Sequence, residues 1–395
     1  MILTQAQTLV LAMSVFFVGV FTHSHFRFFK KYNIPEPVIG GLLFSLLMTA
    51  LYKFYSIDFV LDQEIQSDLM LTFFATVGLN AKFSLFKKGG KKLLIFLGVA
   101  VLYLFIQNII GVGLATVLGL NPLIGLLAGS ITLSGGHATG ASYALKFSEI
   151  GGGIEIAVAC ATLGLVLGGM IGGPVSQYLI AKHKLAPDEK VQDPDDALKE
   201  HGFNEPEVVT TTSVLQTLIC AFFCIFIGQK SSVFFQDSAL HVPDFILVLF
   251  AGIIITNILD LTKNYSIKQQ SLDLVNMTSL TLFLSLAMMS LKLLELVHLA
   301  LPILLIVGVQ AIVIALYSSF VTFRALGKDY EAAAIAGGHC GFGLGATPTA
   351  VANIESITNR YGPAPHAMFI VLMIGAFFID IANAVVIQIF LQLFS

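Results

Sequence analysis

The stretch Gly337–Ala350, which reads GGHCGFGLGATPTA, decides how the chain folds, because it interrupts a strongly apolar sequence with closely spaced glycines. A helix loses roughly 1 kcal/mol for each glycine that replaces alanine. Backbone that leaves the helix inside a membrane is tolerated only against protein or a water-filled cavity. We therefore expect this stretch, and the similar SGGHATG at 134–140, to break their helices and line a site.

The composition places the chain in a membrane. Of its 395 residues 56% are hydrophobic and only 11% are charged, against about 25% charged residues in soluble domains. The net charge of −3 gives no reason to expect a nucleic-acid partner. Apolar runs close to the ~20 residues that span a bilayer recur along the chain. Ten spanning helices are expected, at 5–27, 36–54, 68–83, 92–118, 155–181, 210–230, 243–261, 276–293, 302–324 and 366–393.

Two further uncharged stretches, 121–145 and 332–352, are rich in Gly, Ser and Thr and could either span or turn back. If both turn back and the N-terminus is outside, 17 of the 21 Lys and Arg residues lie in cytoplasmic loops. If both span, only 12 do. Because cytoplasmic loops collect positive charge, we expect re-entrant hairpins, the first entering from outside and the second from the cytoplasm. Both chain termini are then periplasmic.

The segment 183–209 is the one long charged stretch of the chain, with three prolines and eight acidic residues. We expect it to be a cytoplasmic linker between a first half, 1–182, and a second half, 210–395. Each half contains five expected spans and one hairpin.

The two halves resemble each other at an offset of 208 residues. Pro35–Glu36 faces Pro243–Asp244, and residues 118–142 share seven identities with 326–350. The two acids stand at expected helix starts, where the helix dipole favours them, so we interpret them as structural. Because five spans is an odd number, the second half is inverted relative to the first, a pattern typical of secondary transporters. The expected fold is an all-α polytopic membrane protein of two inverted repeats, each with five transmembrane helices and a re-entrant hairpin.

The glycine-rich stretches are the first candidate site, since exposed N–H groups of broken helices face anions and exposed carbonyls face cations. Thr139 and Thr347, equivalent by the 208-residue offset, could reach a carboxylate or Na⁺, or bond back to their own helices. The pairs Gly125/Gly129 and Gly168/Gly172 are better explained by close helix packing. The candidate substrate- and Na⁺-binding residues are Ser134, Gly135, Gly136, His137, Thr139, Gly337, Gly338, His339, Gly341, Gly343, Gly345, Thr347, Pro348, Asp380 and Asn383.

Asp380 is the most informative single residue, because it is the only charge after Arg360 and falls within an expected span. An acid at that depth costs about 3 kcal/mol on insertion scales, so it needs a partner or a cavity. A substrate ammonium, Na⁺ or a structural hydrogen bond would each serve. Asn383, three residues later, shares its helix face.

The two histidines of the glycine-rich stretches, His137 and His339, are not equivalent under the offset. Two histidines without a third nearby ligand are a weak zinc signal. We expect them to shape the hairpins through hydrogen bonds, with direct contact to the substrate as the alternative. The sequence contains neither an H-E-x-x-H motif nor a Cys/His cluster that would suggest a metalloenzyme.

The segments YNIPEPVIGGLL, LTFFATVGLNA, LLAGSITLSGGHATGA, GHCGFGLGATPTAVAN and GAFFIDIANA together resemble the bacterial sodium/glutamate symporter family. The resemblance implies Na⁺-coupled uptake of L-glutamate across the inner membrane, with no cofactor besides the coupling ion. It also implies a lipid-embedded homodimer with the fold of the 2-hydroxycarboxylate transporters, in which a transport domain moves like an elevator. Carried over, it assigns the site to Ser134–Gly140 and Gly337–Pro348. Ala138, where the family commonly has glycine, is a mild departure.

Other hypotheses about the function stay open at this point. The carrier could take aspartate, malate or citrate, although an acid able to meet an α-ammonium favours an amino acid. An intramembrane metalloenzyme would need a ligand cluster that the sequence does not suggest. An ion channel fits less well, because two unlike hairpins in inverted halves match a carrier better than a symmetric pore.

Overall fold

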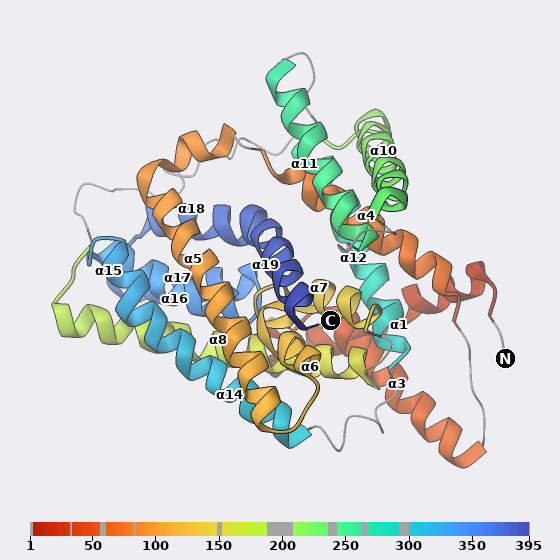
Figure 1. Cartoon of the computed structure of the whole chain (residues 1–395), viewed down its shortest axis with the longest axis horizontal. Coiled ribbons are helices and arrows are strands. Elements are labelled where there is room, and N and C mark those ends of the chain that lie inside the picture. Colours follow the sequence, from red (N-terminus) through yellow and green to blue (C-terminus); the bar gives the residue numbers. More distant parts are fainter. Residues whose placement is uncertain are drawn as a thin grey trace. The chain divides into compact units, whose positions relative to one another are not determined.

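The computed structural model describes residues 3–31, 34–55, 61–82, 84–147, 152–187, 208–235, 243–262, 267–291 and 300–394 (Figure 1). Every regular element in these ranges is a helix. Most of the expected linker, 183–209, lies outside the described residues. The chain forms two compact units, and each combines stretches from both halves of the sequence. Unit 1 comprises Met1–Lys82, Ala144–Glu155 and Pro206–Leu299, and unit 2 comprises Phe83–Tyr143, Ile156–Glu205 and Ala300–Ser395.

Eight helices of the described chain are long and apolar enough to cross a membrane, so the protein is polytopic. They are Gln5–His25, Glu36–Phe54, Gly90–Val117, Gly153–His183, Thr211–Val233, Asp244–Thr262, Gln269–Met289 and Ala300–Ala325. Each matches one of the ten expected spans. The other two expected spans, 68–83 and 366–393, correspond to a helix with a polar first part and to a helix with a π-helical stretch inside it.

Unit 1 contains three long helices from each half of the chain, with one short helix between the first two. They are α1 (Gln5–His25), α2 (Arg27–Lys31), α3 (Glu36–Tyr55), α4 (Gln63–Asn80), α10 (Thr211–Phe235), α11 (Asp244–Thr262) and α12 (Gln269–Met289). Glycines hold neighbouring helices close, because a Cβ built at Gly78 or Gly252 would overlap the backbone of the facing helix. The helices of the two halves are thereby packed directly against each other.

Two helices of unit 1 begin earlier than the sequence predicts. Helix α4 begins at Gln63, although position 68 is expected, because the Asp62 carboxylate accepts hydrogen bonds from the N–H groups of Glu64 and Ile65 at 3.0 and 3.2 Å. Such a cap satisfies orphan donors of the first turn. Helix α12 begins at Gln269, although position 276 is expected. In both helices the first turns are polar, so hydropathy gives no sign of them.

Unit 2 contains the remaining helices, and two of its segments are broken. Its elements are α5 (Ser84–Val117), α6 (Pro122–Leu126), η1 (Leu127–Ile131), α7 (Gly136–Ala144), α8 (Gly153–His183), α14 (Ala300–Tyr317), η3 (Ser318–Thr322), α15 (Phe323–Ala325), α16 (Tyr330–Leu344), α17 (Thr347–Tyr361), α18 (Pro365–Met373), η4 (Ile374–Phe378) and α19 (Ile379–Phe394). We call residues 122–144 the first broken segment and residues 330–361 the second.

The two broken segments start alike. Asn121 and Asp329, which are 208 residues apart, each accept a hydrogen bond from a backbone N–H of the following helix, at 2.9 and 2.7 Å. The helices after the breaks begin at Gly136 and Thr347, which are 211 residues apart. The expected equivalence of Thr139 with Thr347 is therefore wrong, because α16 continues as helix where the first segment has already broken.

Candidate functional site

The glycine-rich stretch of the second broken segment is mostly helical. Helix α16 runs through Gly337, Gly338, Gly341 and Gly343, and the chain leaves the helix only at Gly345 (φ −155°, ψ −86°) and the extended residue that follows it. The prediction that closely spaced glycines unwind the helix is wrong for the first four and correct for Gly345.

The helical glycines of α16 allow close packing. A Cβ at Gly337 would overlap the Ser176 hydroxyl and the Gly172 carbonyl of α8, and one at Gly341 would lie 2.5 Å from Ala350 N in α17. A Cβ at Gly168 would lie 3.2 Å from backbone carbonyls of α16, so the packing expected for Gly168 and Gly172 is confirmed. The energy that α16 gives up in helix propensity is offset by contact with two neighbouring helices.

The first broken segment leaves the helix at Gly129 (φ −106°, ψ −138°), next to Ser130, so the helix packing expected for Gly125 and Gly129 is wrong for Gly129. It is confirmed for Gly125, where a Cβ would overlap the Gly111 carbonyl oxygen. The Ser130 N–H donates to Asn108 Oδ1 of α5 at 2.9 Å, and Asn383 Nδ2 of α19 donates to the Ser130 carbonyl at 2.8 Å. Two amide side chains thus satisfy backbone groups at the break. Asn383, expected from the sequence to serve the site, contacts this segment directly.

The two segments meet at their breaks. Gly136 has a φ of +71°, which glycine adopts readily, and a Cβ built there would lie 3.5 Å from the Gly345 carbonyl oxygen. The Gln107 side chain of α5 joins the two segments. It accepts a hydrogen bond from Ser134 Oγ at 2.7 Å and donates one to the Gly343 carbonyl at 2.8 Å.

Gln107, Asn108 and Gln310 were missed by the sequence analysis. Gln310 Nε2 donates to the backbone carbonyl of Gln107 at 2.7 Å, and all three side chains are fully buried. A signal was present in the sequence, because LFIQNIIG (104–111) places two adjacent amides inside an apolar run. Buried amides in a membrane span are expensive unless hydrogen-bonded, which makes them candidates for a functional site.

A π-helical stretch lies beside the second segment. This stretch, η4, joins α18 to α19 with helical backbone at both of its ends, and a Cβ at Gly375 would lie 2.9 Å from Thr347 Oγ1. Asp380 follows η4 by two residues and is half-buried. It has no hydrogen bond or ion pair with any residue that the structure describes. A carboxylate in such a position is costly unless it has a partner or reaches water.

Accessibility separates the candidate residues into two groups. The side chains of Ser134, His137, Thr139 and His339 are buried, together with the helical glycines of α16. The residues at the breaks that remain accessible are Gly135, Gly136, Ala346, Thr347 and Pro348. The polar backbone at the breaks therefore reaches the surface of unit 2, whereas the flanking helices hold it in place.

The two histidines make structural hydrogen bonds. His137 Nε2 lies 3.1 Å from Thr162 Oγ1, and His339 Nδ1 lies 2.9 Å from Thr322 Oγ1. The His339 ring packs among aromatic rings, including Phe96 at 5.3 Å between ring centroids. These positions favour the expected role of shaping the segments. Among the described residues, no three His, Cys, Asp or Glu side chains are placed to hold a metal ion.

The other candidates have packing neighbours. Thr139 lies beside Gly135, since a Cβ on Gly135 would be 2.8 Å from Thr139 Cβ and 2.9 Å from Asn383 Nδ2. Gly338 faces the side chains of Ile354 and Val371. Of the fifteen residues named from the sequence, Gly136 is brought to Gly345 and Gly135 to Thr139 and Asn383, whereas most of the glycines within α16 serve packing.

Known proteins resemble the chain over nearly its whole length. A family model described as sodium/glutamate symporter matches residues 1–363. The chain is 47% identical to the sodium/glutamate symporter of Escherichia coli (strain K12) over 392 residues, which cover 98% of this chain and 97% of that protein. The sodium/glutamate symporter of Shigella flexneri shows the same identity and coverage. That of Haemophilus influenzae is 41% identical over 389 residues, covering 97% of this chain and 96% of that protein.

Proposed function

The chain belongs to the sodium/glutamate symporter family, and we infer that it is a transporter, not an enzyme, that couples Na⁺ to the uptake of glutamate. The observation that carries the site assignment is the meeting of two helix breaks in unit 2, where Gly136 approaches the Gly345 carbonyl. Broken helices that meet in this way expose both N–H groups and carbonyls, the groups that bind a carboxylate and a cation.

The glutamate carboxylates bind at the breaks, next to the N-terminus of α17. That helix begins at Thr347 without a side-chain cap, and its first residues are accessible. Pro348 has no N–H and the Thr349 N–H donates to the Ala346 carbonyl at 3.0 Å, so the Thr347 N–H and the positive end of the helix dipole are what favour an anion here. The hydroxyl of Thr347 stands at the same place and supplies a further donor.

Charge compensation in this site comes from Na⁺ and backbone amides. Residues 93–145, 329–359 and 361–395, which form the breaks and the helices around them, contain no Lys or Arg. Glutamate carries a net charge of −1 at neutral pH, so Na⁺ held by carbonyls and hydroxyls at the breaks neutralises the occupied site. The unpartnered Asp380 carboxylate binds the α-ammonium or contributes to Na⁺ binding.

The family architecture implied by the resemblance agrees with the positions of the helices. Helices α3 and α11 begin 208 residues apart, as do α6 and α16, which supports two repeats of one arrangement. The odd number of spans per repeat supports inversion, with re-entrant segments, an inner-membrane location and both termini periplasmic. Unit 2 is the moving transport domain of an elevator, and unit 1 is the scaffold and carries the dimer contact.

Transport into liposomes tests the function. Purified protein is reconstituted, and labelled L-glutamate uptake is followed with an inward Na⁺ gradient and with choline in its place, with aspartate and citrate as competitors. We expect accumulation only with Na⁺, and competition by unlabelled glutamate above the other anions. Na⁺-driven uptake of citrate or aspartate in preference to glutamate would show that the site binds another substrate. Uptake without saturation or counterflow exchange would indicate a channel.

A further inference from the structure

A short basic and aromatic segment follows the first long helix of unit 1. Residues 23–31 read HSHFRFFKK and contain two histidines, Arg27, Lys30 and Lys31 among three phenylalanines. The chain has no Asp or Glu before Glu36. Positive charge therefore gathers beside the end of a membrane span without acidic residues among it.

The fold exposes the side chains of Arg27 and Lys30. Helix α1 ends at His25, Phe26 is extended (φ −104°, ψ 114°), and α2 begins at once with Arg27. Phe29 is half-buried, and Phe26 and Phe28 approach it edge-on, at 6.2 and 5.6 Å between ring centroids. This contact holds α2 in position and leaves Arg27, Phe28 and Lys30 exposed.

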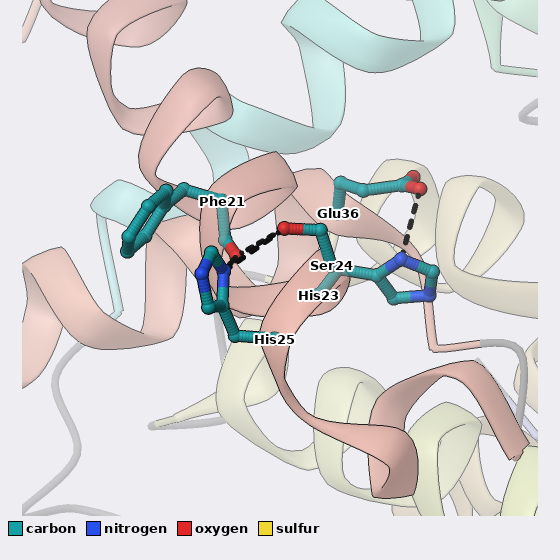
Figure 2. Close-up of polar contacts among 5 residues, drawn as sticks. All are labelled: Phe21, His23, Ser24, His25 and Glu36. Carbon is teal, nitrogen blue, oxygen red and sulfur yellow. Dashed lines mark hydrogen bonds and ion pairs between the residues drawn. The ribbon is translucent and has the colours of Figure 1, made fainter.

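The exposed apolar surface of α1 leads directly into this segment. Val10, Met13, Phe17 and Phe21 recur at helical spacing and are all exposed. Figure 2 shows Phe21 beside His25, with ring centroids 4.2 Å apart and His25 Nδ1 2.8 Å from the Phe21 carbonyl oxygen. A stripe suited to acyl chains thus ends where the positive charges begin.

Arg27 and Lys30 remain unpaired. Glu36, the nearest acid in sequence, lies 3.5 Å from His23 Nδ1 (Figure 2). Within the described parts of the chain, neither Arg27 nor Lys30 makes an ion pair or a hydrogen bond. Both charges are available to a ligand that approaches from the membrane surface.

We propose that the segment from His25 to Lys31 is a binding site for the phosphate headgroup of an anionic phospholipid. The guanidinium of Arg27 can pair two phosphate oxygens, and Lys30 adds a point charge. The rings of Phe26 and Phe28 are exposed beside these charges and can contact the acyl chains of the same lipid. A second copy of this chain fits less well, because a two-fold contact would set the same positive charges against each other.

Lipid binding to the purified, full-length protein tests the site. Native mass spectrometry in detergent measures binding of phosphatidylglycerol and of phosphatidylcholine to the wild type and to Arg27→Gln/Lys30→Gln. Each basic residue near a membrane surface contributes about 1 kcal/mol of attraction, or about fivefold in affinity. We expect phosphatidylglycerol binding to weaken by roughly 25-fold in the double variant, and phosphatidylcholine binding to stay unchanged.

The control is Lys53→Gln/Lys230→Gln, which changes the net charge equally at two exposed lysines that have no basic neighbour in sequence. It should bind phosphatidylglycerol as the wild type does. The charge-conserving variant Arg27→Lys/Lys30→Arg should retain most of the binding, and added salt should weaken binding to the wild type. Equal loss in both Gln variants, or a change in oligomeric state with lipid binding intact, would overturn the proposal.

Discussion

Asp380 has no hydrogen bond or ion pair with any described residue and, unlike the unpartnered hydroxyls of Ser130 and Thr349, it can carry a full charge. Asn383, one turn later, is already used by the Ser130 carbonyl. A half-buried carboxylate without a partner pays part of the desolvation cost, which a bound cation offsets. The unpartnered Asp380 and the hydrogen-bonded Asn383 therefore have different roles on one face of α19.

Asp380→Asn should abolish Na⁺-driven glutamate uptake while the protein is still made and inserted, because the amide carries no charge to offset a cation. Initial uptake rates in liposomes measure the effect. Asp260→Asn, at an exposed position of α11, is the matched control and should transport normally. Uptake at the wild-type rate in Asp380→Asn would exclude the proposed role.

Gln107→Leu should lower the free energy of unfolding by about 1–3 kcal/mol, because it leaves the Gly343 carbonyl and the Ser134 hydroxyl buried without their partner. Thermal unfolding in detergent measures this loss. Gln107→Glu keeps the acceptor for Ser134 but buries a carboxylate against the Gly343 carbonyl, so its midpoint should fall at least as far as that of the Leu variant. A Leu variant as stable as the wild type would show that Gln107 does not join the segments.

At the scale of elements, α16 is packed so closely that its glycines cannot be replaced freely. A Cβ at Gly341 would lie 2.5 Å from Ala350 N, and the facing backbone of α17 would have to move. Gly308, in the middle of α14, has no atom of another element near its missing Cβ. The two glycines are both helical, yet they stand in opposite environments.

Gly341→Ala should destabilise the protein by about 1–3 kcal/mol through overpacking and should slow uptake by displacing α17 at the break. Gly308→Ala should be neutral or stabilising by up to about 1 kcal/mol, because alanine favours the helix. Unfolding midpoints of the two variants provide the comparison. Equal effects at both positions would contradict the packing argument.

A second contact between helices, the one between α16 and α18, contains a group that titrates. The Glu331 carboxylate at the start of α16 accepts a hydrogen bond from the Ala367 N–H of α18 at 2.6 Å. Burial raises the pKa of this carboxyl to about 7, and the Asp329 charge adds to the rise. Because the folded protein holds this proton more tightly than the unfolded chain, Glu331 contributes stability at low pH that is lost as pH rises towards 7.

The free energy of unfolding should fall by about 3 kcal/mol between pH 4.5 and 7 through this group. Glu331→Gln keeps an acceptor for Ala367 and removes the titration, so its stability should vary less over this range. Unfolding midpoints at several pH values measure the difference. Glu355 is an exposed acid of α17, and Glu355→Gln should retain the wild-type pH dependence. If Glu331→Gln also retained it, the contact between Glu331 and Ala367 would not contribute to stability.

The sequence located these elements well where hydropathy was the signal and less well elsewhere. The starts of α3 and α11 were predicted correctly, because an acid after proline marks them. The start of α4 was not, because its first turns are polar and rest on the Asp62 cap. A glycine that permits close packing looks the same in sequence as one that breaks a helix. Gln107 was missed because its importance lies in joining residues far apart in the chain.

At the scale of the whole molecule, the inverted arrangement makes a prediction about sidedness. Lys53 and Lys230 should be outside, and Lys182 and Lys268 should be cytoplasmic. In a variant without native cysteines, each lysine is replaced by cysteine and labelled in intact cells with an impermeant maleimide. Only the first two positions should react before the membrane is opened. Labelling of all four, or of the opposite pair, would refute the inverted topology.

Unit 2 is assembled from distant stretches of the chain, and this has a consequence for how the protein is made. Its three stretches are separated in the chain, and the last begins at Ala300. A ribosome delivers Ser134 and Gln107 to the membrane some two hundred residues before Gly343, their shared partner, is synthesised. During that interval these polar groups have no native contact with the second broken segment. Chains truncated before residue 300 should therefore be recognised and degraded by the quality-control proteases of the membrane.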